Sequence, residues 1–144
     1  MQLVTSSWFF WALLAAVFAA LTAVFAKVGV SEINSNFATF LRTVVVVVAL
    51  GVLIWTTGEN QSLSTLSPKT SVFLVLSGLA TGASWLCYFR ALQLGNVSQV
   101  APIDKLSVVL VAIIAAVFLG ESMSLTGWSG VALIGVGALL VAVA

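Results

Sequence analysis

Charged residues are scarce in this sequence. Only 6% of its 144 residues carry a charge, as five Lys or Arg and four Asp or Glu, and histidine is absent. Soluble domains carry about one quarter charged residues, so too few are present here to cover a soluble fold. Nucleic-acid binding requires clustered Lys and Arg, and the net charge of +1 comes without a basic tract. These absences argue against a soluble domain and against a nucleic-acid partner.

Residues that carry chemistry are equally scarce. Cys87 is the single cysteine, which excludes an internal disulfide and a thiolate metal cluster. We expect it to behave as a small buried apolar side chain. The sequence shows no nucleophile–base pair, no metal-ligand spacing and no phosphate loop. It therefore predicts neither an enzyme nor a bound cofactor or metal ion.

Long apolar runs are what the sequence does contain. Hydrophobic residues make up 62% of the chain, and the mean hydropathy is +1.25. A helix needs about 20 predominantly apolar residues to cross a bilayer, whereas barrel strands are shorter and alternate. The chain is therefore predicted to be an all-α integral membrane protein, a bundle of five transmembrane helices. The predicted spans are residues 8–26, 37–56, 70–93, 99–119 and 128–144, and the first is expected to be retained because no basic stretch precedes it.

An odd number of spans places the two termini on opposite sides of the membrane. The side of the N-terminus, side A, then holds Lys69 in the longest loop, and the opposite side, side B, holds Lys27. Because these loop cations balance each other, the positive-inside rule gives almost no orientation bias. Insertion in both orientations is therefore physically reasonable for this chain.

Four ionisable residues fall inside the predicted spans at a common depth. At about 1.5 Å per residue, Arg42, Arg90, Asp104 and Lys105 lie roughly 5 to 9 Å inside the side B boundary. Asp104 and Lys105 are about 100° apart on a helix and are expected not to pair with each other. Long basic side chains can snorkel to the interface as mere anchors, but intramembrane charges tend to mark transport paths, and a short carboxylate cannot snorkel far. All four are therefore candidate residues of a substrate path.

Hydroxyl groups follow one face of the third predicted span. Ser77, Thr81, Ser84 and Tyr88 are spaced i, i+4, i+7 and i+11, which places them on one side of a helix. Such a face either mediates helix packing or lines a polar cavity, and the spacing favours neither. Arg90 lies about 200° around the helix from Tyr88 and belongs to a separate feature.

Small residues and one proline shape the last two spans. Pro102 is expected in the first turn of the fourth helix, where its missing N–H costs little. Gly130, Gly135 and Gly137 leave little side-chain bulk on the fifth helix. They predict close helix packing, either within the chain or across an oligomer.

Three stretches of the chain carry recognisable motifs: GLATGASWLCYFRALQLGNVSQVAPIDKLSVVL at residues 78–110, FLGE at 118–121 and GVALIGVGALL at 130–140. They resemble the EamA domain of the drug/metabolite transporter superfamily, and so does a first helix that ends at Lys27. Most relatives fuse two such five-helix domains in opposite orientation, whereas this sequence resembles the short members with one. The resemblance implies a single domain over residues 1–144 that forms half of a ten-helix inverted-repeat-like assembly.

A single copy implies work as a pair, because inverted repeats that rock about a midplane site give alternating access. The resemblance therefore implies a secondary transporter of small metabolites, expected to export them as a homodimer, parallel or antiparallel, in a plasma membrane such as the bacterial inner membrane. The related small multidrug resistance proteins use a first-helix glutamate for cationic drugs. Here that place falls near Ala19, and the first helix has no acidic residue. Three cations against one carboxylate in the spans favour an amino acid or organic anion as substrate.

Two other functions stay open. The chain could be a lipid-handling, flippase-like subunit, which a dependence of its activity on lipid would reveal. It could also be an accessory membrane subunit without transport of its own. Besides a second copy of the chain, the expected partners are membrane lipid and a small-molecule substrate.

Overall fold

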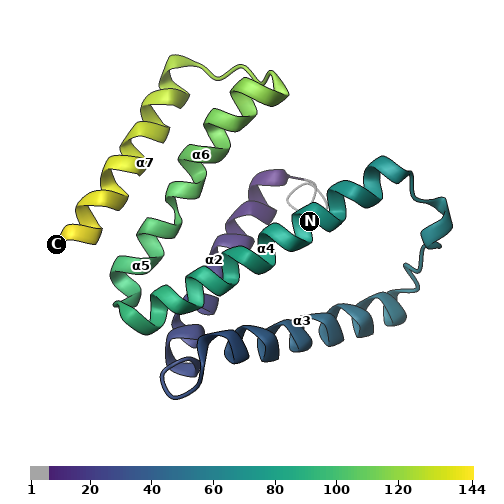
Figure 1. The fold of residues 1–144 in the computed structure, drawn as a ribbon. Helices are drawn as coiled ribbons and strands as arrows, with labels where there is room; N and C mark the ends of the chain where they lie inside the picture. The colour runs from purple at the N-terminus through teal and green to yellow at the C-terminus, as the bar shows by residue number, and fades with distance from the viewer. Residues whose placement is uncertain (1–6) are drawn as a thin grey trace. The chain divides into compact units, whose positions relative to one another are not determined.

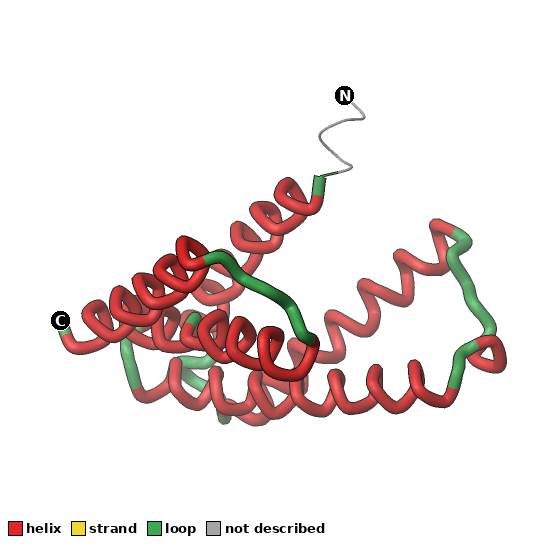
Figure 2. Tube along the Cα trace, turned by 90° about the horizontal axis from the view of Figure 1, so that it is seen from above, coloured by secondary structure: helices red, strands yellow, loops and turns green. Residues whose placement is uncertain are grey.

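A computed structural model describes residues 7–144 and confirms an all-α membrane fold. Figure 2 shows helices joined by loops, with no strand in the described part of the chain. Five stretches are long and apolar enough to cross a membrane, and the fourth consists of three helical segments in succession. The stretches are α2 (Trp8–Gly29), α3 (Ser35–Thr57), α4 (Pro68–Leu94), the span of α5 (Val97–Asp104), α6 (Leu106–Ile114) and η2 (Ala115–Leu119), and α7 (Leu125–Val143).

The described residues form two compact units. One unit contains the chain up to Lys27 together with Leu94–Ala144, and the other contains Val28–Gln93. We call them the α5–α7 unit and the α3–α4 unit and describe each by itself.

The α3–α4 unit is a helical hairpin. Asn34 caps the start of α3, because its side-chain oxygen accepts the backbone N–H of Asn36 at 2.9 Å and of Phe37 at 3.4 Å. This cap starts the helix two residues before the predicted boundary. Gly58 ends the helix in the left-handed conformation, with φ 69°. In Figures 1 and 2 the two helices lie together near the C-terminal end of α4 and separate toward their connection, which contains the short helix η1 (Leu63–Thr65).

The α5–α7 unit is built around α7. This helix packs along both α5 and α6 (Figure 1). The contact is close at Gly135, where an added Cβ would lie 3.3 Å from Cγ2 of Val109 on α6. Ser124 caps α7 by accepting the N–H of Gly127 at 3.1 Å, so the helix begins at Leu125 rather than at Trp128 as predicted. At the other end of the unit, Lys27 Nζ donates to the carbonyl of Gly95 at 2.7 Å, which joins the end of α2 to the turn before α5.

The fourth span is interrupted, although the sequence predicted one helix. The regular helix breaks at Lys105, whose N–H is shared between the carbonyls of Ala101 at 3.3 Å and Pro102 at 3.0 Å. Pro102 is inside α5 rather than in its first turn, because the helix starts at Val97. Proline has no N–H, so it cannot donate to the carbonyl one turn earlier, that of Ser98. The span ends in the π-helical turn η2 and stops at Gly120, with φ 67°.

Candidate functional site

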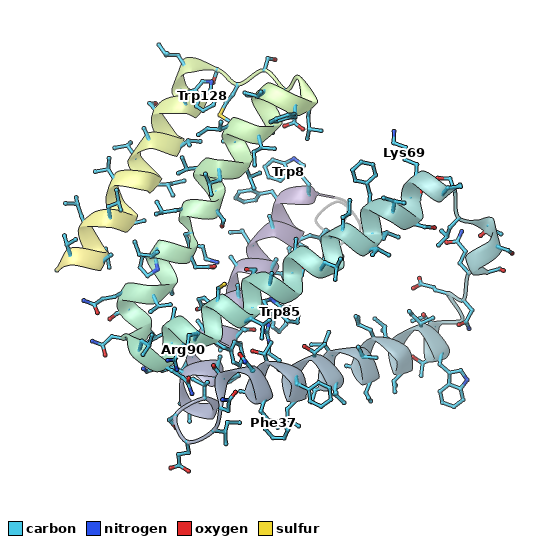
Figure 3. The ribbon with its side chains drawn as sticks, viewed as in Figure 1. Trp8, Phe37, Lys69, Trp85, Arg90 and Trp128 are labelled. Carbon is cyan, nitrogen blue, oxygen red and sulfur yellow. The ribbon has the colours of Figure 1, made fainter. Side chains whose placement is uncertain are left out.

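Arg42 is held by aromatic rings of the neighbouring helix. It is half-buried on α3, and its guanidinium carbon lies 4.0 Å from the centroid of the Trp85 ring and 5.5 Å from that of Phe89. Figure 3 labels Trp85 on α4. The distances are those of cation–π contacts, which stabilise a cation by about 0.5–2 kcal/mol without cancelling its charge. No Asp or Glu occurs in α3 or α4.

Arg90 belongs to a different network at the end of α4. Its guanidinium donates to the side-chain oxygen of Gln93 at 3.1 Å. The amide nitrogen of Gln93 donates in turn to the carbonyls of Val30 at 3.2 Å and Ile33 at 2.7 Å. These bonds satisfy backbone carbonyls in the connection between α2 and α3. Arg90 therefore supports the end of the hairpin, and this contact favours an anchoring role.

Asp104 and Lys105 form an ion pair, contrary to the prediction from helix geometry. Lys105 Nζ lies 3.1 Å from Oδ2 of Asp104, and the two side chains are 55% and 35% exposed. The expectation of separate directions assumed a continuous helix. The helix breaks at Lys105, and the flexible four-carbon stem of lysine lets its ammonium group reach the neighbouring carboxylate.

The proposed layer of four charges separates into two local arrangements. Arg42 and Arg90 lie in the α3–α4 unit, and Asp104 and Lys105 lie in the α5–α7 unit. Within each unit the cations find different partners: aromatic rings and an amide in the first, a carboxylate in the second. The shared depth of the four residues stays a prediction.

The hydroxyl face of α4 contains one local contact. Thr81 donates to the carbonyl of Ser77 at 2.9 Å, so this hydroxyl is satisfied within its own helix. Ser77, Thr81 and Ser84 are exposed, and Tyr88 is half-buried. Exposure of the row leaves both interpretations, helix packing and cavity wall, as predictions.

Cys87 is exposed on α4, whereas the sequence analysis expected a buried thiol. That expectation came from proteins in water, where apolar side chains avoid the surface. A helix surrounded by lipid gains nothing from hiding a small apolar side chain.

Sequence reasoning missed three residues that shape these arrangements: Trp85, Phe89 and Gln93. A signal for the first two was present, because Trp85 and Phe89 are spaced i, i+4 and so form an aromatic pair on one helix face. Gln93 gave no such signal, since its bonds go to a segment about 60 residues earlier in the chain. Among residues 7–144, no three His, Cys, Asp or Glu side chains come together in a group able to hold a metal ion.

The comparisons with known proteins agree with this architecture. The EamA-like transporter family matches residues 6–143. A relative from a Sinorhizobium species, named "Uncharacterized transporter in cobO 3'region", is 60% identical over 139 residues, which covers 96% of this chain and 99% of the relative. No solved structure matches the chain. A multi-pass helical membrane protein whose length is matched almost completely in both comparisons belongs to the EamA-like transporter family.

Proposed function

We propose that this membrane transporter moves small metabolites that carry a carboxylate, such as amino acids or organic acids, by alternating access as a homodimer. The observation that carries the choice of an anionic group is the partnership of Arg42. Its guanidinium lies against the face of Trp85 at 4.0 Å, in a hairpin whose helices contain no carboxylate. A guanidinium held by its face keeps its in-plane N–H donors, which match a carboxylate in a bidentate arrangement.

The dimer follows from the number of helices. Transporters that use alternating access rock two repeats about a site at the midplane, and one copy of this chain supplies five spans. A second copy supplies the other half, in a parallel or an antiparallel orientation. The chain then acts as one domain of about 144 residues, half of a ten-helix assembly. The similar protein comes from a Sinorhizobium species, so we place the dimer in the inner membrane of a bacterium, with export as its direction.

Transport by purified protein in vesicles tests this function. Radiolabelled glutamate and malate serve as anionic probes and lysine as the cationic one, each followed by exchange against the same unlabelled compound. We expect exchange of at least one acid and none of lysine. Exchange of lysine alone would contradict the choice of an anionic substrate. Lipid movement between leaflets without exchange of any probe would favour a flippase-like function instead.

Dilution tests the dimer. Reconstitution at less than one chain per vesicle isolates single copies, and we expect exchange to disappear in those vesicles and to return when two chains are covalently linked. Activity in single-copy vesicles would show that one chain is sufficient. Tags at the C-terminus, probed from both sides of the membrane, then distinguish an antiparallel from a parallel pair.

A further inference from the structure

The pair of Asp104 and Lys105 stands out by its place in the fourth span. Asp104 is the only acidic residue in any of the five spans, since Glu32, Glu59 and Glu121 all lie in connections. Its carboxylate is 3.1 Å from the ammonium group of Lys105. The pair sits where the regular helix breaks, about 10 Å along the span from Val97 at 1.5 Å per residue. Irregular backbone at membrane depth is tolerated only where protein buries it or where it lines a water-filled cavity.

The surroundings of the pair contribute no other charge. The helices α6 and α7, which pack with α5, contain no ionisable side chain. On α2 the ionisable residue is Lys27, whose Nζ donates to the carbonyl of Gly95 at the turn before α5. The charge state of this part of the α5–α7 unit therefore depends on Asp104 and Lys105 alone. With both groups ionised the pair is neutral, and with Asp104 protonated it carries one positive charge.

We infer that Asp104 binds a proton and that the proton couples anion transport to the proton gradient, with Lys105 as the cation that the transported anion then neutralises. This inference rests on the proposed transport of anions. In the empty carrier the carboxylate neutralises Lys105, and the spans can rearrange. A proton from water adds to Asp104, its partnership with Lys105 is lost, and the substrate carboxylate takes over as counter-ion. Proton and anion leave together on the other side, and the original pair forms again.

This scheme explains why the two partial states do not turn over. A protonated carrier without an anion holds an uncompensated cation inside the membrane, and an anion bound beside the ionised Asp104 repeats a negative charge; both are costly in low dielectric. Only the empty neutral pair and the carrier with both ligands rearrange. The combined gradients of proton and anion then set the direction, so a cell with an excess of the acid exports it. A sodium ion suits the position less well, because the Lys105 ammonium already lies against the carboxylate and would repel it.

The test separates exchange from accumulation in vesicles with an imposed pH gradient, with radiolabelled glutamate or malate as the probe. Wild type is expected to exchange the acid and to accumulate it when the labelled side is acidic. Asp104→Asn leaves Lys105 permanently without its partner, so the carrier is expected to lose accumulation completely while it keeps a slower exchange. Glu121→Gln, which removes a carboxylate from the loop after η2, is the matched control and should keep both activities.

Each other outcome has a defined meaning. Absence of exchange in wild type would refute the proposed function, and the inference with it. Exchange by wild type without any response to the pH gradient, accumulation by Asp104→Asn, or accumulation driven by sodium at equal pH would refute the proton site alone. If Asp104→Asn loses both activities, Asp104→Glu decides, because it keeps a group that can bind a proton. Recovery of accumulation by this variant supports the inference, whereas recovery of exchange without accumulation overturns it.

Discussion

The two units deal with cations inside the membrane in different ways. In the α3–α4 unit, Arg42 lies against the rings of Trp85 and Phe89, which moderate the cost of the charge and leave it in place. In the α5–α7 unit, Lys105 lies against Asp104, which cancels its charge as long as the carboxylate is ionised. One unit therefore carries a permanent positive charge, and the other carries one that a proton can uncover. The difference suggests a division between recognition of the substrate and control of the cycle.

Replacing Arg42 should break this comparison with the largest effect. Arg42→Gln removes the permanent cation and with it a charged hydrogen bond to the substrate, which contributes about 1.5–3 kcal/mol. The apparent affinity for glutamate or malate should fall roughly 10- to 150-fold at about 1.4 kcal/mol per factor of ten. The measurement is the concentration dependence of exchange at matched amounts of folded protein. Lys69→Gln in α4, near its exposed start, is the control, and equal losses in the two variants would remove Arg42 from the site.

The second cation of the α3–α4 unit should matter for stability instead. Gln93→Leu removes the acceptor of Arg90 and the two bonds to the carbonyls of Val30 and Ile33. At about 1 kcal/mol per bond, the loss should be roughly 2 kcal/mol of unfolding free energy. Thermal unfolding in detergent, compared with Gln61→Leu in the exposed loop, measures it. A variant as stable as the control but with weakened anion affinity would place this end of the hairpin in the transport path.

The aromatic contact itself should give an intermediate effect. Trp85→Leu keeps apolar bulk but removes the ring face under Arg42, which should cost about 1 kcal/mol of stability. Trp85→Phe should recover part of that loss, because phenylalanine still presents a ring. Trp55→Leu, at the exposed far end of α3, controls for the loss of a tryptophan at the membrane surface. The comparison of midpoints of thermal unfolding for the three variants gives the answer, and identical midpoints would mean that the ring does not stabilise the cation.

The smallest effects concern packing within the α5–α7 unit. An alanine at Gly135 would meet Val109 at 3.3 Å, a tight contact, whereas an alanine at Gly137 meets nothing within 4 Å in a single chain. Gly135→Ala should therefore lower stability by about 1 kcal/mol or less, and Gly137→Ala should leave the monomer unchanged. Size-exclusion chromatography then measures dimer formation for both. Weaker dimerisation of Gly137→Ala alone would assign that face of α7 to the contact between copies.

The sequence was sufficient to predict the five spans, because long apolar runs report directly on the bilayer. Their ends shifted by up to three residues, since the caps Asn34 and Ser124 start α3 and α7 earlier than hydropathy alone indicates. The interruption at Lys105 was not predicted. Pro102 was visible, but its effect depended on where α5 begins.

The candidate site was less predictable than the spans. Spacing along one helix cannot show which residues of another helix face it, so the contact of Arg42 with Trp85 could not be derived. The pairing of Asp104 with Lys105 was predicted wrongly, because ideal helix geometry was applied across a break. Residue identity indicated correctly which side chains were unusual for a membrane, and only the fold showed their partners.

The π-helical turn at Ala115–Leu119 has a consequence for the gene. A π turn closes its hydrogen bonds over five residues instead of four, so it holds one residue more than an α turn. Deleting a single codon within this segment would convert it to α-helix and rotate everything that follows by about 100°. One codon therefore sets the angle at which the chain enters its last connection. A scan of single-codon deletions through the segment would separate the length needed to span the bilayer from the rotation needed to direct α7.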